Sequence, residues 1–169
     1  LDTLFNFIVN HQAIEICYKP FNKPAVQWVL YPYHIKQYNN RWFLFAQNEA
    51  QQIVTVALDR IKEIAPSNTP YIPSDIDFSE YFDDVIGVSI LNVPTEHILL
   101  KFNSARLPYV ISKPLHHSQK FKDKDNGIIE IQVKPNRELI SQLLSFGEDV
   151  EILQPENLRN EIKAKIVLG

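Results

Sequence analysis

Aromatic and cationic side chains gather in the first 60 residues, in a pattern suited to holding a planar, anionic ligand. Arg60 can give a phosphate two parallel hydrogen bonds from a permanently charged guanidinium. Stacking of a base on an aromatic ring contributes roughly 1 to 3 kcal/mol, so two aromatic faces and one arginine could hold a short oligonucleotide. The candidate ligand-binding residues are Tyr18, Tyr31, Tyr33, Arg41, Trp42 and Arg60, with electrostatic reach added by Lys19, Lys23 and Lys36.

Each of these residues also has a structural interpretation. Arg60 follows Asp59, and the two could form an ion pair at a strand end, where such pairs contribute little. We interpret Trp42 as barrel core more readily than as a ligand platform, because a small barrel needs large aromatic side chains inside. For Tyr18 and Tyr33 both interpretations stay open, and the lysines are interpreted as solvated loop charges.

Motifs for catalysis or metal binding are not found. The sequence has four glycines and lacks the GxSxG, P-loop and Rossmann patterns, while Cys17 alternates with apolar residues and should be inert. His116 and His117 are adjacent on a predicted strand, so their side chains should point to opposite faces and not share one ion. The sequence therefore predicts no enzyme, no metal and no cofactor.

Composition is that of an ordinary globular protein of one domain or two small ones. The 169 residues are 45% hydrophobic and 22% charged, with a net charge of −3, so any nucleic-acid contact needs a local patch or another domain. One cysteine allows no internal disulfide, and no segment has the length of a signal peptide or membrane span. We expect a cytoplasmic protein without membrane contact. Because Met is absent, we also expect the later part of a longer chain.

The first half predicts a short helix and five strands. Apolar residues spaced as on one helix face mark residues 1–9, and they should pack across the mouth of a barrel. Asn39 and Asn40 tolerate the positive φ of a two-residue hairpin turn. Five short antiparallel strands that close on themselves indicate an Sm-like or SH3-like barrel. The predicted strands are residues 14–18, 26–38, 41–47, 52–58 and 59–64.

The second half follows the order βαββαβ and then α, as in a ferredoxin-like fold. Three prolines in 65–76 predict an extended connection, followed by a short helix at 78–82. The strands are predicted at 97–102, 115–121, 128–133 and 150–153. The helices are predicted from Ser104 to Ile111, from the cap Asn136 to Gly147, and after Pro155. The fold class is α+β, with domains 1–76 and 93–169 joined by a linker at 77–92.

Several motifs give the chain a resemblance to a known family. Trp42-Phe43-Leu44, with Pro32 before it and Leu58-Asp59-Arg60-Ile61 after it, resembles the WYL domain, which is named for a Trp-Tyr-Leu run. The second half resembles the WCX extension. The segments Tyr18 to Phe21, Asn39 to Trp42 and Ser112 to Gln119 look like the variant found in bacterial regulators.

The resemblance implies a bacterial transcriptional regulator. In that family a winged-helix domain N-terminal to the barrel binds promoter DNA, the barrel senses a nucleotide or single-stranded nucleic acid, and the WCX part supports a homodimer. The chain departs from the family pattern at four positions. Phe43 replaces Tyr, Val54 and Ala57 stand where Arg is frequent, and Tyr31 stands where His is common. The expected site is therefore less basic than in the family.

Two hypotheses remain open. In the first, the barrel binds a nucleotide-like effector and the WCX half transmits its presence through a dimer. In the second, the chain is a structural dimerisation module without a ligand. A concave pocket with Arg60 and a tyrosine would favour the first, and burial of those groups would favour the second.

Overall fold

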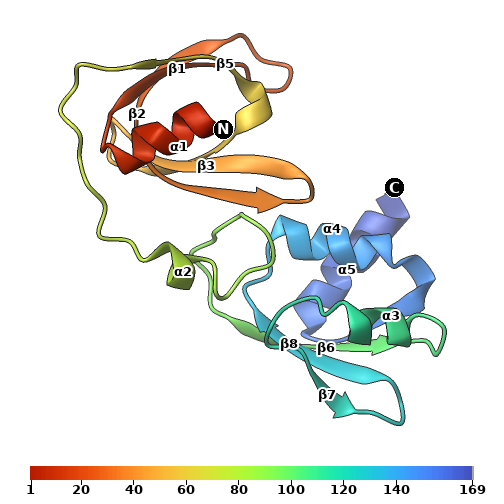
Figure 1. The fold of residues 1–169 in the computed structure, drawn as a ribbon. Coiled ribbons are helices and arrows are strands. Elements are labelled where there is room, and N and C mark those ends of the chain that lie inside the picture. The colour runs from red at the N-terminus through yellow and green to blue at the C-terminus, as the bar shows by residue number, and fades with distance from the viewer. Residues whose placement is uncertain (169) are drawn as a thin grey trace. The chain divides into compact units, whose positions relative to one another are not determined.

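The computed structural model describes residues 1–168, which form two compact units divided between Phe78 and Ser79. Both units mix α-helices with one antiparallel β-sheet, five-stranded in the first unit and four-stranded in the second (Figure 1). No helix among the described residues is long and apolar enough to cross a membrane.

The first unit is a bent sheet in the order β4-β3-β2-β1-β5, with a helix against it (Figure 1). The predicted closure of the fifth strand against the first is confirmed, because Ile64 pairs with Ile16. A three-residue 3₁₀ turn joins the two edge strands. The elements are α1 (Asp2–Val9), β1 (Ile14–Tyr18), β2 (Val26–Tyr38), β3 (Arg41–Asn48), β4 (Ile53–Ala57), η1 (Leu58–Arg60) and β5 (Ile61–Pro66).

The turn between β2 and β3 confirms the predicted hairpin. Asn39 and Asn40 have φ angles of 49° and 62°, the left-handed conformation that a two-residue hairpin turn requires. A bulge between Pro32 and His34 shifts the register of the same hairpin. Because of this bulge, Leu30 and Ile35 both face the core, although residues five positions apart lie on opposite faces of a regular strand.

The core of the first unit lies between the sheet and α1. Leu4 is buried in it, and Phe7 and Ile8 pack against it, so the helix covers one side of the bent sheet. The predicted apolar stripe of this helix is only partly correct. Leu1, Phe5 and Val9 are more than half exposed, so the buried face of α1 is narrower than the sequence pattern indicated.

The second unit has the strand order β7-β8-β6-β9, and α4 and α5 lie on one side of the sheet (Figure 1). Inward residues of both layers, among them Ile98, Leu100, Leu139 and Leu158, are fully buried. The elements are α2 (Phe78–Tyr81), whose first residue belongs to the first unit, β6 (Glu96–Phe102), α3 (Leu107–Ser112), β7 (Lys120–Asp123), β8 (Ile128–Val133), α4 (Arg137–Ser145), η2 (Gly147–Asp149), β9 (Val150–Gln154) and α5 (Glu156–Leu168).

Two details of the predicted second half are wrong. Ser104 does not cap α3, because that helix begins at Leu107, and Asn103 accepts a hydrogen bond from the backbone of Arg106 instead. Residues 115–119 form a turn and not a strand, so β7 begins only at Lys120. Gln119 holds this turn by accepting from the Leu115 amide and donating to the Val110 carbonyl.

The same turn places His116 and His117 side by side. Their ring centroids are 4.0 Å apart, and Nε2 of each ring lies within 3.0 Å of the Asp83 carbonyl oxygen. Nδ1 of His116 accepts from the Ser118 amide at 3.2 Å, so the neutral ring carries its proton on Nε2. That nitrogen therefore acts as a donor and not as a metal ligand. Among the described residues, no group of three or more His, Cys, Asp or Glu is placed to hold a metal ion.

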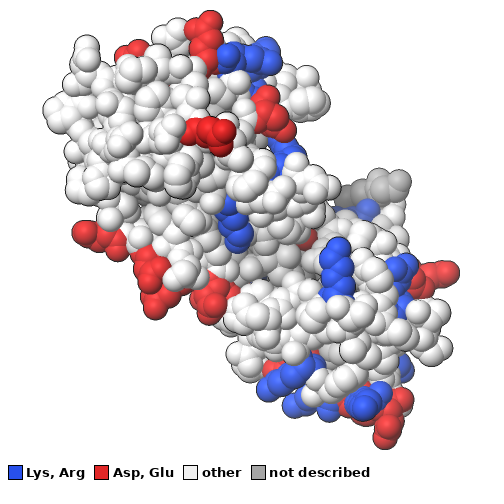
Figure 2. Space-filling view, viewed as in Figure 1, with Lys and Arg blue, Asp and Glu red and all other residues white. Residues whose placement is uncertain are grey.

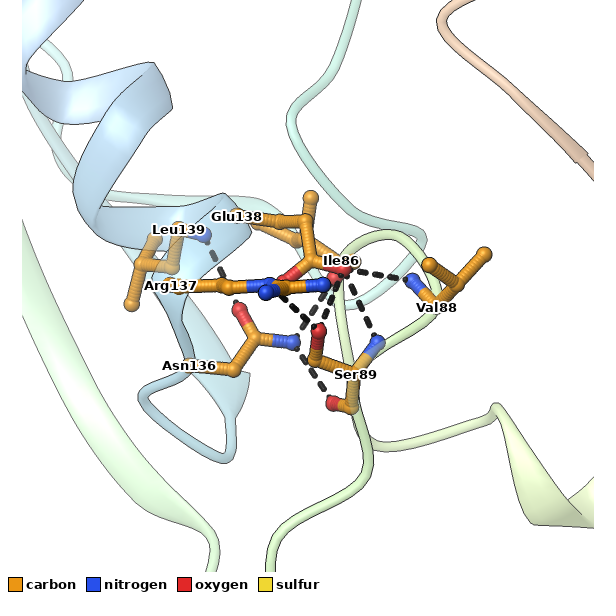
Figure 3. A network of polar contacts seen from close by, with 7 residues as sticks. All are labelled: Ile86, Val88, Ser89, Asn136, Arg137, Glu138 and Leu139. Atoms are coloured by element: carbon orange, nitrogen blue, oxygen red, sulfur yellow. Dashed lines mark hydrogen bonds and ion pairs between the residues drawn. The ribbon is translucent and has the colours of Figure 1, made fainter. Parts of the chain in front are cut away.

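A polar network ties the segment before β6 to the start of α4 (Figure 3). Oδ1 of Asn136 accepts from the Leu139 amide at 2.9 Å and caps α4, as predicted. Its Nδ2 donates to the carbonyls of Ile86 and Ser89. Oε1 of Glu138 accepts from the amides of Val88 and Ser89 and from the Ser89 hydroxyl. These bonds fix the loop over the helix N-terminus.

Candidate ligand-binding site

Arg41, at the start of β3, forms a two-pronged ion pair with Asp59 of η1. Nε donates to Oδ2 and Nη2 donates to Oδ1, both at 2.9 Å. The pair lowers the pKa of Asp59 and raises that of Arg41 through this hydrogen bonding, so both groups stay charged over the physiological range. The sequence paired Asp59 with its neighbour Arg60, and the structure instead pairs it with an arginine 18 positions away.

Tyr18 and Arg60 lie at the same end of the bent sheet as this ion pair. Tyr18 pairs with Ile61, and the Lys19 amide donates to the Arg60 carbonyl at 2.9 Å. Tyr18 and Arg60 also act electrostatically on Arg41 and Asp59, respectively. Tyr18 in turn stacks on Trp28, with ring centroids 4.9 Å apart. We call Tyr18, Trp28, Arg41, Asp59 and Arg60 the barrel-end cluster.

Trp42 is not a core residue. Its side chain is 38% exposed, so the interpretation of Trp42 as barrel filling is wrong. The large buried side chains of β3 are Leu44 and Phe45, on opposite faces of the strand. Trp42 is therefore accessible as an aromatic face, next in sequence to Arg41.

Tyr31 and Tyr33 are separated from the barrel-end cluster and are covered by the chain that follows β5. Tyr31 is 5% exposed and meets Tyr71 edge to face. The Tyr33 hydroxyl lies 2.8 Å from the Ile72 carbonyl oxygen, and the Tyr71 hydroxyl donates to the Pro32 carbonyl at 2.9 Å. Residues 67–78, which we call the connecting segment, thus pack along this face of β2.

Aromatic stacking completes the attachment of the connecting segment. The Phe78 ring lies parallel to the His34 ring at 4.9 Å, and burial lowers the pKa of His34. Burial, together with Tyr71 and Tyr31, raises the pKa of Tyr33 to about 12. His34, for which the sequence offered only a structural role, therefore packs against an aromatic ring.

Comparison with known families decides the identity of both units. The sequence model of the WYL domain matches residues 1–66, and that of the WCX domain matches residues 94–167. The chain carries a WYL domain followed by a WCX domain. The two matches together cover most of the sequence, and they confirm the family to which its motifs pointed.

Solved structures similar to this WYL–WCX chain are distant in sequence. A CRISPR Cas-related protein matches 98% of the chain at 14% identity with a TM-score of 0.56, and the match covers 48% of that protein. Proteasome accessory factor B/C of Arthrobacter aurescens matches 95% of the chain at 17% identity with a TM-score of 0.44, over 25% of its own length. This chain thus spans half of those proteins or less. No curated protein matches it.

A shallow hollow of about 250 Å³ lies beside the barrel-end cluster in the WYL domain. It is bordered by Trp28 and Val54, and its single charged lining residue is Glu49. An arginine at position 54, as the family resemblance implied, would have made this hollow basic. Its actual lining does not attract an anion, so the arginines of the barrel-end cluster remain the cationic groups of this region.

Three of the six ligand-binding residues predicted from the sequence, Tyr18, Arg41 and Arg60, thus lie in one cluster. The two other members of the cluster, Trp28 and Asp59, were not predicted to belong to the site. Trp28 pairs with Ile16, which places it diagonally across from Tyr18 on the neighbouring strand. The pairing of the first two predicted strands would therefore have indicated a Tyr18–Trp28 contact. The Arg41–Asp59 pair did have a signal, because continuing the antiparallel register of β3 and β4 past their paired residues places these two side chains opposite each other.

Proposed function

We propose that this chain is the ligand-sensing and dimerisation part of a bacterial transcriptional regulator, and that the barrel-end cluster binds a nucleotide or single-stranded nucleic acid. The observation that carries the proposal is two arginines beside an aromatic stack within a WYL domain. Promoter DNA would be bound by a domain N-terminal to this chain, as the family resemblance implies. The regulator would act as a cytoplasmic homodimer.

Arginine, rather than overall charge, must provide the affinity in this proposal. Figure 2 shows Lys and Arg side chains interspersed with Asp and Glu on the visible face, and the net charge is −3. Arg60 forms no hydrogen bond or ion pair through its side chain with the described residues, so its guanidinium can meet a phosphate directly. Tyr18 on Trp28 supplies the apolar surface on which a base can stack.

Arg41 would join the site by exchanging partners. Its side chain and that of Asp59 are 41% and 58% exposed, and exposed ion pairs of this kind contribute about 0 to 1 kcal/mol. A phosphate can accept the same two parallel hydrogen bonds that the carboxylate accepts now. Binding of the effector would therefore separate Arg41 from Asp59 at little cost.

The finer fold assignment supports this placement of the site. We propose that the WYL unit is an Sm-like barrel, because its sheet bends until its edge strands are joined by η1. The WCX unit would be ferredoxin-like, with the strand order expected from the sequence pattern βαββαβ. We retain 1–76 and 93–169 as domain limits, with a linker at 77–92.

The alternative function is a structural dimerisation module without a ligand. It is favoured by the engagement of Tyr31 and Tyr33 with the connecting segment, which leaves these two candidates unavailable. It is also favoured by an apolar hollow of about 410 Å³ in the WCX unit between α4, β9 and α5, near the exposed side chain of Ile166. Apolar surface of this kind is typical of subunit contacts.

Binding to a labelled short single-stranded oligonucleotide tests the proposal. Fluorescence anisotropy at roughly 50 and 200 mM salt should show an affinity that falls with salt, because each neutralised phosphate contributes a slope of about −0.7 on logarithmic axes. Arg60→Ala should weaken binding about tenfold and remove one such contribution. Lys165→Ala, which removes an exposed charge from α5, is the matched control and should bind as the parent does.

The alternative predicts a different result. No binding by the parent chain at high micromolar concentration, together with a dimer in sedimentation equilibrium, would favour the dimerisation module. Equal weakening by Arg60→Ala and Lys165→Ala would show that binding follows net charge and not the barrel-end cluster.

A further inference from the structure

A second hollow lies wholly within the WCX unit, where β9 ends and α5 begins. Its volume is about 740 Å³, within the range of small-molecule sites. It is lined by His97 of β6, by residues 153–155 at the end of β9, and by Arg159, Asn160 and Lys163 of α5. The end of β9 and the first turns of α5 thus border an open groove with an apolar patch and several polar groups.

The His97 ring is oriented by a hydrogen bond to a buried carboxylate on the neighbouring strand β8. Its Nδ1 lies 2.6 Å from Oε1 of Glu130, whose side chain is 7% exposed. The hydrogen bond from His97 lowers the pKa of Glu130, so the Glu130 side chain is a carboxylate at neutral pH. It accepts a hydrogen bond from the Nδ1–H group of His97. Nε2 is then the ring nitrogen available to a ligand in the groove, and the orientation of the ring is fixed before any ligand arrives.

The α5 wall presents two cations one helical turn apart. Arg159 and Lys163 are four positions apart, so they lie on the same side of the helix. Nη2 of Arg159 is 3.8 Å from Oε1 of Glu151, which is longer than a hydrogen bond, so the guanidinium keeps donors for a ligand. The amide of Asn160 adds a neutral hydrogen-bonding group beside them.

Two carboxylates limit which anion the groove can favour. Glu156 lines it, and Glu151 stands next to Arg159, so the charges of Arg159 and Lys163 are balanced nearby. A bare anion gains little there. A molecule with a phosphate at one end and hydrogen-bond donors at the other satisfies both the cations and Glu156, and its body can rest on Leu153.

We propose that this groove binds a phosphate-bearing small molecule of nucleotide size, with the phosphate held by Arg159 and Lys163 and with a hydroxyl or amino group of the ligand donating to Nε2 of His97. The site is separate from the barrel-end cluster and lies in the other unit. The WYL–WCX chain would then respond to two ligands, one at each unit.

The test is an NMR titration of the complete chain with ADP, with inorganic pyrophosphate as a second probe. Shifts of the His97 ring and of amides in residues 153–163 are expected, with weaker binding of pyrophosphate because it lacks the body that contacts Leu153. The double variant Arg159→Gln/Lys163→Gln should weaken ADP binding at least about tenfold, as expected for the loss of charge-assisted hydrogen bonds. His97→Gln should weaken it as well.

Controls separate this site from general charge and from the proposed sensor. Lys165→Gln removes a charge from the same helix outside the groove lining, and Arg60→Ala disables the barrel-end cluster. Neither should change the ADP affinity of the groove. Shifts confined to the WYL unit, equal weakening by Lys165→Gln, or no shift at about 10 mM ADP, well above the affinities of functional sites, would overturn the proposal.

Discussion

Replacing Asn136 with aspartate should destabilise the WCX unit, although aspartate caps helices as well as asparagine does. Asn136 is 1% exposed, and its amide has two separate tasks. Oδ1 caps α4 at the Leu139 amide, and Nδ2 donates to the Ile86 and Ser89 carbonyls at 2.8 and 3.0 Å (Figure 3). Aspartate keeps the cap and turns an oxygen toward two carbonyl oxygens.

The magnitude follows from these contacts. Loss of two buried hydrogen bonds, with an acceptor left against acceptors, should lower the free energy of unfolding by about 2 to 4 kcal/mol for Asn136→Asp. Asn136→Ser keeps a cap and loses the two donated bonds without repulsion, so about 2 kcal/mol is expected. Asn136→Ala loses the cap as well, and its cost should be about 3 kcal/mol.

Urea unfolding followed by far-UV circular dichroism measures these differences. Hydrogen exchange resolved by peptide adds a location, since protection should fall around residues 85–89 and α4 more than in β2 and β3. A cost for Asn136→Asp within about 0.5 kcal/mol of zero would refute the reasoning, because it would mean that capping alone accounts for this residue.

Three further predictions concern other parts of the chain. A Cβ at Gly87, where φ is +80°, would lie 2.6 Å from Cγ of Glu138, so Gly87→Ala should cost roughly 2 kcal/mol or more in urea unfolding. Gly147→Ala, at φ +57° with open space around it, is the control and should cost about 1 kcal/mol. Asp59→Asn should raise oligonucleotide affinity severalfold in the anisotropy assay by releasing Arg41, and a lower affinity would contradict the partner exchange. The pKa of His116 is lowered by burial, so an NMR titration should place it below 6.5. The unfolded chain then takes up that proton more readily, and the contribution of His116 to stability is complete above pH 6.5 and lost as the pH falls through the folded pKa. A titration of His116 above 6.5 would contradict this.

The elements with strong local signals were predictable. The alternation in β1, the hairpin at Asn39-Asn40 and the cap at Asn136 depend on residues close in sequence, and all three are confirmed. The turn at 115–119 was not, because the sequence pattern predicted a strand where two hydrogen bonds of the Gln119 side chain, one accepted and one donated, fold the chain back. The pattern of apolar and polar residues in a segment does not indicate such a contact between a side chain and the backbone.

The candidate site was predictable in its residue types and less so in its geometry. The bulge after Pro32 shifts the register of β2, and the connecting segment then covers Tyr31 and Tyr33. Arg41 meets Asp59 because the antiparallel register of β3 and β4, continued by two residues, places the two side chains opposite each other. The bulge and the cover over the tyrosines depend on packing between residues distant in the sequence, whereas the cross-strand ion pair follows from the register of one hairpin.

Trp28 and Trp42 make intrinsic tryptophan fluorescence a useful measurement for this chain. They are its only two tryptophans, both belong to the WYL unit, and their side chains are 36% and 38% exposed. Tryptophan emission from the unlabelled chain therefore reports on solvent contact in that unit alone. A base stacking on the Tyr18–Trp28 pair should quench it, whereas ADP bound in the WCX groove should leave it unchanged, so one spectrum distinguishes the two proposed ligands.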